Sequence, residues 1–266
     1  AFPIVSVNFE PMPISQLHKI IQDFRPIGLD EMDSGTKLMN RVDTKFVLNV
    51  DHLIEILPQL KEEYRILEIQ GVRFPSYESE YFDDKKLTFY IDHHRKKVDR
   101  YKVRYRKYIE SNIAFLEVKH KKKGRTDKQR IKVDDLPGTM SKEDHDFVKS
   151  TGVPLDNLEL VLTNKFSRIT FVGINHNERL TFDINLSFFK DDKEIVLSNL
   201  VIAELKQARV IRNSPFYAIM KGLLVRPFRI SKYCIGIIEL YGRENVKYNR
   251  FKKKLLKINK LRNNVA

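Results

Sequence analysis

The sequence predicts an α+β protein in which an antiparallel eight-stranded β-barrel forms a tunnel, with amphipathic helices packed outside. Several runs, most clearly 102–106 and 115–119, alternate one apolar residue with one charged residue. Because strand side chains alternate between faces, each run has an apolar side and an ionic side. About eight such strands with mostly short links, and the absence of a repeat or linker, favour one domain over residues 1–266. An open, strongly twisted sheet is the structural alternative.

Local signals place the elements along the first part of the chain. Ser15 can cap an amphipathic helix over 15–24, and Asp51 can cap a second helix to about residue 63, which Pro58 should shorten. Turn-prone and charged segments separate the strand-like runs that follow. Strands are expected at 41–48, 77–83, 87–91, 100–108, 113–120 and 127–133.

The second part of the chain continues the same alternation. Short helices are expected at 141–150 and 154–163, and Ser214 with Pro215 begins a helix that runs to about residue 224. A basic amphipathic helix over 246–261 ends the pattern; it could pack on the barrel, touch an anionic membrane or collect product. Further strands are expected at 165–173, 179–189 and 195–206.

The charge balance points to an anionic partner. The chain carries 49 Lys and Arg against 35 Asp and Glu, a formal net charge of +14. Nucleic acid, an anionic membrane surface or a phosphate-rich small molecule would each suit such a protein. The single cysteine, Cys234, excludes an internal disulfide and is expected to be a small core residue. The longest apolar run, 195–205, is too short and too interrupted to span a bilayer.

The direction in which the ionic face points decides the function. The amphipathic helices need an apolar surface on which to pack, so the apolar strand face should point outward and the ionic face into the tunnel. The alternative has charges solvated outside and apolar residues within. The expected inner face consists of Arg41, Asp43, Lys45, Lys102, Arg104, Arg106, Glu117, Lys119, Lys128, Arg130, Lys132, Arg168, Arg179, Asp183, Glu204 and Lys206.

The order of these motifs resembles a known family. They are Arg41-x-Asp43-x-Lys45, Tyr81-Phe82-Asp83, Lys102-x-Arg104-x-Arg106, Glu117-x-Lys119, Asp127-Lys128-Gln129-Arg130, Lys165-Phe166-Ser167-Arg168, Arg179 to Asp183, Glu204-x-Lys206 and Ser231-Lys232. Together they resemble the VTC domain, the polyphosphate polymerase module of the vacuolar transporter chaperone complex and its stand-alone relatives. This domain belongs to the triphosphate tunnel metalloenzymes, and the similarity covers about residues 36–240.

The resemblance implies an enzyme that transfers the γ-phosphoryl group of ATP to a growing polyphosphate chain with a divalent metal, Mn²⁺ or Mg²⁺. Catalytic roles fall to Lys45, Arg104, Arg106, Arg168 and Glu204. Phosphate or nucleotide binding falls to Lys102, Lys119, Lys128, Arg130, Lys206, Ser231 and Lys232. Metal binding falls to Glu204 and Glu117, which could instead be salt-bridge partners that neutralise the cavity.

Other functions compete with this interpretation. A tunnel triphosphatase would need nearly the same ligands, although Arg41 stands where related hydrolases carry the first Glu of Glu-x-Glu-x-Lys. A non-catalytic polyphosphate or nucleic-acid binding module is a second alternative. Tyr101 and Tyr105 lie opposite Arg104 and Arg106, which disfavours base stacking in a cationic groove.

Weaker motifs and the expected setting complete the interpretation. No Walker-type loop is present, and the adjacent His93 and His94 should point to opposite strand faces at the surface. The expected partners are ATP and polyphosphate, without a specific nucleic acid. The expected location is the cytoplasm, where a partner or peripheral membrane association could hold the protein at the inner face of a membrane.

Overall fold

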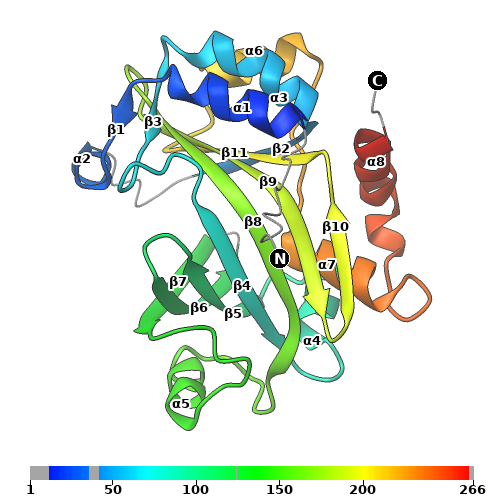
Figure 1. The fold of residues 1–266 in the computed structure, drawn as a ribbon. Coiled ribbons are helices and arrows are strands. Elements are labelled where there is room, and N and C mark those ends of the chain that lie inside the picture. The colour runs from blue at the N-terminus through cyan, green and yellow to red at the C-terminus, as the bar shows by residue number, and fades with distance from the viewer. Residues whose placement is uncertain (1–11, 36–41, 124, 264–266) are drawn as a thin grey trace, which may run out of the picture. The chain divides into compact units, whose positions relative to one another are not determined.

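The computed structural model describes residues 12–35, 42–123 and 125–263 (Figure 1). Its strands are β1 (Pro26–Ile27), β2 (Val42–Asn49), β3 (Tyr64–Leu67), β4 (Ser76–Asp83), β5 (Arg100–Tyr108), β6 (Ile113–Lys122), β7 (Arg125–Val133), β8 (Glu159–Gly173), β9 (Glu178–Lys190), β10 (Lys193–Leu197) and β11 (Leu200–Gln207). Its helices are α1 (Met12–Gln22), α2 (Leu29–Gly35), α3 (Val50–Ile56), η1 (Leu57–Leu60), α4 (Thr88–Arg95), α5 (Lys142–Ser150), α6 (Pro215–Gly222), α7 (Lys232–Tyr241), η2 (Asn249–Phe251) and α8 (Lys252–Asn263).

The strands form one eleven-stranded sheet. Eight of them follow the order β2-β11-β9-β8-β4-β5-β6-β7, while β1, β3 and β10 pair beside this path. The pairings from β8 through β4, β5 and β6 to β7 are all antiparallel. Within the part of the chain that the structure describes, no pairing joins β2 to β7. The predicted α+β class with a large antiparallel sheet is therefore confirmed.

The chain divides into two compact units, which are described separately. Unit 1 comprises residues 1–73, 169–182 and 201–227, and unit 2 comprises 74–168, 183–200 and 228–266. The long strands β8 and β9 contribute to both units.

Unit 1 is held together by an aromatic core under its short helices. Phe216 of α6 lies edge-on to Phe46 of β2 and to Phe182 of β9, with ring centroids 5.6 Å apart in both pairs. Such edge-to-face contacts add to the stabilisation from burying large apolar rings. Pro58 lies in η1, which follows α3, so the predicted shortening of this helix is confirmed.

In unit 2, the two faces of the sheet meet different partners. Val103 and Tyr105 of β5 are buried, and the Tyr105 hydroxyl donates a hydrogen bond of 2.7 Å to Asp144 of α5. The opposite face carries Arg104 and Arg106, which are each only 8% exposed. An apolar face under helices and an ionic face shielded from solvent is the orientation that the sequence predicts.

Helix α7 lies on the ionic side of the unit 2 sheet. Its Tyr233 ring stacks on Tyr81 of β4, with centroids 5.3 Å apart. A Cβ added at Gly236 would meet Phe188 of β9 at 2.5 Å and Leu162 of β8 at 3.0 Å. The helix therefore packs directly against β8 and β9, and only a glycine fits at this position.

Three element predictions are wrong. Residues 88–91 of the predicted strand 87–91 lie in helix α4, because the Asp83 carboxylate accepts hydrogen bonds from the backbone N–H groups of Phe89 and Tyr90 at its start. Residues 154–158 are not helical, and 159–163 begin strand β8. The run 195–206 is split into β10 and β11 at Asn199, whose φ of 60° makes a turn.

The correction at α4 changes the setting of its two histidines. His94 is 6% exposed, and its Nε2 atom lies 2.7 Å from Asn249 Oδ1. The His93 ring packs 6.4 Å from the Tyr233 ring. Neither is the surface strand residue that the sequence predicts, since both lie on a helix that packs against its neighbours.

Candidate anion-binding site

The strand register of unit 2 sets charged residues side by side on one face. Lys102, Lys119 and Lys128 are paired across β5, β6 and β7. The neighbouring row on the same face pairs Arg104 with Glu117, and Glu117 with Arg130. Directly opposed side chains on one face lie close enough to interact, so this register concentrates positive charge.

Glu117 is fully buried and holds two of these cations. Its Oε2 atom accepts from the Nε and Nη2 atoms of Arg104 at 2.8 and 2.6 Å, and its Oε1 atom forms an ion pair with Lys128. Burial opposes ionisation of this carboxyl group, but Arg104, Arg106 and Lys128 outweigh it and lower its pKa. Its assignment as a metal ligand stays a prediction that these ion pairs disfavour.

Arg106 has a different environment. Its Nε atom donates to Ser79 Oγ at 3.1 Å, and its guanidinium lies 5.9 Å from the Tyr77 ring centroid and 5.6 Å from that of Phe166. Among the described residues, no carboxylate lies within ion-pair distance of it. A buried cation without an anion is costly, so this arrangement suits an arginine that receives its counter-charge from a ligand.

Lys119 is a second cation of this kind. It is half-buried on β6, and the structure gives it no carboxylate partner within the residues described. The neighbouring Arg104 guanidinium, together with burial and Arg106, holds its pKa well below the usual range of a lysine. Binding an anion here would favour the charged ammonium.

A second carboxylate, Asp183 of β9, is bound by cations from two elements. Its oxygens accept from the Nε and Nη2 atoms of Arg168 at 2.5 and 2.8 Å, and it also pairs with Lys232 at the start of α7. Burial opposes its ionisation, but Arg168 and Lys232 outweigh burial and lower the pKa of Asp183. Burial lowers the pKa of Lys232 to about 8, although Asp183 acts in the opposite direction.

The start of α7 is fixed against this site. Ser231 caps the helix by accepting from the backbone N–H of Cys234, and Lys102 donates to the same hydroxyl at 3.1 Å. Tyr233 donates to the buried Asp83 carboxylate. These contacts hold Lys232 beside the sheet.

Tyr81 connects α7 to the arginine row. Its hydroxyl accepts from Arg104 at 3.1 Å, while its ring stacks on Tyr233. Burial alone would raise the pKa of Tyr81, but Arg104, Arg106 and other cations overcome it and lower the pKa to about 8. A tyrosine perturbed by cations is a further sign of the positive potential at this site.

Unit 1 carries a smaller charged cluster. Glu204 of β11 pairs with Lys45 of β2, and its second oxygen lies 3.3 Å from the Lys206 ammonium. One partly exposed carboxylate fits a Mn²⁺ or Mg²⁺ ion whose remaining ligands are phosphate oxygens and water. In the described part of the chain, no three His, Cys, Asp or Glu residues are grouped as a metal site by themselves.

A family model describes most of this chain. The VTC domain model matches residues 40–241, which include both charged clusters. The chain belongs to the VTC domain family. A comparison with curated proteins finds no match.

Solved structures with a similar fold share little sequence with this VTC domain. A candidate adenylate cyclase from Vibrio parahaemolyticus is 14% identical with a TM-score of 0.44, and the match covers 74% of this chain and 97% of that one. One from Bacillus halodurans is 13% identical with a TM-score of 0.48, covering 72% and 94%. One from Hippeastrum, described as having a dominant triphosphatase activity, is 12% identical with a TM-score of 0.46, covering 74% and 94%. The family assignment rests on the VTC match alone.

The VTC domain thus divides the predicted site residues between its two units. Arg130 lies at the exposed strand β7, with its guanidinium 4.3 Å from the Phe115 ring centroid. Arg41 lies outside the described residues. Unit 2 brings together Lys102, Arg104, Arg106, Glu117, Lys119, Lys128, Arg168, Ser231 and Lys232; unit 1 brings together Lys45, Glu204 and Lys206.

Sequence reasoning did not assign roles to several supporting groups. Ser79 and Tyr81 bind Arg106 and Arg104, and Asp183 binds Arg168. Tyr81 and Asp183 both lie in the motifs that resemble the VTC domain, so those motifs carried the signal. Ser79 had no such signal, because a serine in a strand is common and indicates no particular role.

No helix in the described part of the chain is long and apolar enough to cross a bilayer.

Proposed function

We propose that this VTC domain is an ATP-dependent polyphosphate polymerase. The observation that carries the proposal is the excess of cations in unit 2. Six cations (Arg104, Arg106, Lys119, Lys128, Arg168 and Lys232) surround two carboxylates, Glu117 and Asp183. Arg106 and Lys119 have no carboxylate within ion-pair distance among the described residues. A ligand with several negative charges would supply what the protein lacks.

The residue types suit phosphate rather than another anion. Arginine forks match two phosphate oxygens at once, and lysines add compact point charges. In this mechanism, Arg104 and Arg168 are held in place by Glu117 and Asp183, and they present preorganised donors to a phosphoryl group. Phosphoryl transfer depends mainly on such positioning and charge neutralisation, with little covalent chemistry by the protein.

The proposed step balances without a proton donor. An anionic oxygen of the terminal phosphate of the polyphosphate chain attacks the γ-phosphorus of ATP in line. The bond from that phosphorus to the β,γ-bridging oxygen breaks, and ADP leaves with the electron pair. The chain is then one phosphate longer.

We assign Lys45, Lys206 and Glu204 to the same reaction by their match to the VTC motifs. Glu204 would hold a divalent metal, which would neutralise charge on the phosphate oxygens as the leaving group departs. The lysines beside Glu204 would bind phosphate once a metal ion takes over the carboxylate. This assignment is independent of the cation excess in unit 2.

The decisive assay incubates the purified protein with ATP and Mn²⁺ and resolves the products on a gel. Polymer that grows with time, with ADP released in step, is the expected result. Free phosphate without chain growth would replace the proposal with a tunnel triphosphatase. Tight binding of tripolyphosphate without any turnover would replace it with a polyphosphate receptor.

A further inference from the structure

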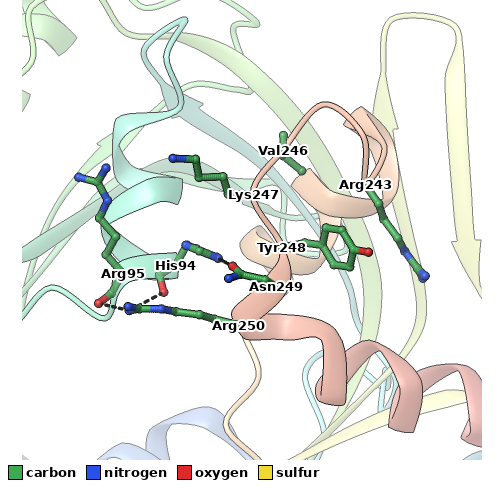
Figure 2. Close-up of a pocket in the computed structure, with 8 residues that line it drawn as sticks. All are labelled: His94, Arg95, Arg243, Val246, Lys247, Tyr248, Asn249 and Arg250. Carbon is green, nitrogen blue, oxygen red and sulfur yellow. Dashed lines mark hydrogen bonds between the residues drawn. The ribbon is translucent and has the colours of Figure 1, made fainter.

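A second cationic surface lies elsewhere in unit 2. Helix α4 and the segment that follows α7 line an open hollow of about 550 Å³, which we call the α4 groove (Figure 2). It is lined by His94, Arg95, Arg243, Val246, Lys247, Tyr248, Asn249 and Arg250. Except for His94 and Arg95, these residues lie beyond the end of the VTC match at residue 241, so the family model does not account for the groove.

The wall of the groove is fixed by specific contacts. Arg250 donates to the Arg95 carbonyl oxygen at 2.7 Å, at the end of α4 where helix carbonyls lack partners. The Tyr90 hydroxyl donates to the Lys247 carbonyl oxygen at 2.7 Å, and the Tyr90 ring stacks on Phe251. The cations of the groove are therefore presented by an ordered backbone.

Two of these cations are available to a ligand. Arg95 and Lys247 are exposed, and neither has a carboxylate partner within the described residues. Figure 2 shows the Arg95 guanidinium and the Lys247 ammonium on the same side of the groove, whereas Arg243 points away. Arg243 lies 3.9 Å from Glu239, so its charge is already paired.

The sequence after the groove extends the positive surface. Residues 245–263 contain eight Lys or Arg and no Asp or Glu. Lys254 of α8 is half-buried, and its pKa is lowered by burial and by Lys96, which follows Arg95. Lys252 and Lys253 at the start of α8 are exposed and lie two and three residues after Arg250 of the groove, so the positive surface continues from the groove into this helix.

This surface suits a phosphate chain better than a membrane. The apolar residues Leu255 and Ile258 of α8 are buried in the protein, and Leu256 is the one large apolar residue in 242–263 that is strongly exposed. Membrane-surface helices need a free apolar face as well as positive charge. Base stacking is also disfavoured, because the Arg243 guanidinium lies 5.8 Å from the centroid of the Tyr248 ring.

We call the anion-binding site of unit 2, which contains Arg104, Arg106 and Lys119, the sheet site. We propose that the α4 groove, with the basic segment 247–254, binds the polyphosphate chain outside the sheet site and guides the product away from it. This inference rests on the proposed function for the identity of the chain. A short triphosphate would occupy the sheet site alone, whereas a long chain would contact both surfaces and bind more tightly through the linked sites.

The test compares two double charge reversals in the full chain. Arg95→Glu/Lys247→Glu removes the groove cations, and Lys85→Glu/Lys86→Glu changes the net charge equally at two exposed lysines before α4. Binding of long-chain polyphosphate and of tripolyphosphate is measured for both variants over a range of salt concentrations.

The groove variant should bind long-chain polyphosphate at least about tenfold more weakly. The slope of log K against log salt should fall by about 0.7 for each phosphate that the groove no longer neutralises. Tripolyphosphate binding should be unchanged, and the control variant should resemble the wild type. Equal losses in both variants would show a net-charge effect and overturn the proposal. A second result would also overturn the proposal. In it, the wild type binds phosphatidylserine vesicles, and the groove variant loses this binding but still binds long-chain polyphosphate.

The same data separate the two proposals. If the wild type fails to bind tripolyphosphate or to make polymer, the proposed function fails. The groove is then judged by its effect on long-chain binding alone. A second charge reversal, Lys252→Glu/Lys253→Glu on the exposed side of α8, should also weaken the binding of long-chain polyphosphate, but by less. This variant keeps the proposal testable if the Arg95→Glu/Lys247→Glu variant fails to fold.

Discussion

The two charged clusters of this protein differ in how well their charges are paired. In unit 1, Lys45 and Lys206 both contact Glu204, so the cluster carries its own counter-charge. In unit 2, Glu117 and Asp183 bind four cations between them, while Arg106 and Lys119 have no carboxylate partner among the described residues. In the proposed function, this difference assigns the anionic ligand to unit 2 and the metal cation to the carboxylate of unit 1.

The largest expected effect separates two arginines that are two residues apart. Arg106→Gln should reduce turnover by about 10²- to 10³-fold, because it removes a preorganised donor to the phosphoryl group. The free energy of unfolding without ligand should stay the same or rise, since the substitution removes a buried cation that has no partner. Activity assays and chemical denaturation measure the two effects.

Arg104→Gln is the matched control for that prediction. It leaves the buried Glu117 with one fewer cation, so the protein should lose about 3 kcal/mol of stability as well as activity. An equal loss of stability in both variants would mean that Arg106 also has a structural counter-charge, and the contrast between the arginines would disappear.

Helix α7 offers a steric test of the unit 2 site. Gly236→Ala should lower the free energy of unfolding by about 1–3 kcal/mol, because the added methyl group has no room beside Phe188 and Leu162. Thermal or chemical unfolding measures the loss. Gly222→Ala in α6 is the control, since nothing lies within 4 Å of its added Cβ. If both variants are equally stable, α7 does not pack closely on β8 and β9.

The role of the unit 1 carboxylate, Glu204, is tested by measuring metal binding. Glu204→Gln should weaken Mn²⁺ binding in the presence of a triphosphate analogue by at least about tenfold, comparable to the loss when groups around a metal are altered. Electron paramagnetic resonance of free Mn²⁺ gives the affinity without relying on turnover. Metal-free binding of tripolyphosphate should remain, because the cations of unit 2 are unchanged. Unaltered Mn²⁺ affinity would contradict the assignment of Glu204.

The smallest expected effect is a dependence on pH. The pKa of Lys232 and that of Tyr81 are both about 8 in the free protein. Above pH 8, Lys232 loses its positive charge and Tyr81 gains a negative one, and both changes disfavour a bound polyanion. The affinity for tripolyphosphate should therefore fall as pH rises from 7 to 9, by about fivefold in all, because each of the two groups supplies only part of the charge that the ligand meets. Lys232→Arg and Tyr81→Phe should each flatten the profile, and a profile unchanged in both would exclude these groups.

Much of the sheet could be predicted from the sequence, because strict alternation of apolar and charged residues is a strong strand signal. It located β4, β5 and β9 almost to the residue. The failures arose where tertiary contacts override a local pattern. Asp83 begins a helix at residues that alternate like a strand, and α7 is apolar on all sides because it is buried, so it shows no periodicity.

The candidate site was predictable only in part. Residue types and motif order identified Arg104, Arg106, Arg168 and Lys119. Which cations have a counter-charge depends on the strand register and on α7, and neither can be read from the spacing of motifs. The distinction between Arg104, bound to Glu117, and Arg106, bound to Ser79, therefore required the structure.

The most direct test of the central claim is thermal unfolding, with and without tripolyphosphate, of the wild type and of the double variant Arg106→Gln/Lys119→Gln. The wild type should be stabilised by the ligand, by about 2.7 kcal/mol when its concentration is one hundred times Kd. The variant should be at least as stable as the wild type without ligand, and should gain nothing when ligand is added. An equal gain in both proteins would show that these two cations do not hold the phosphate, and the central claim would be contradicted.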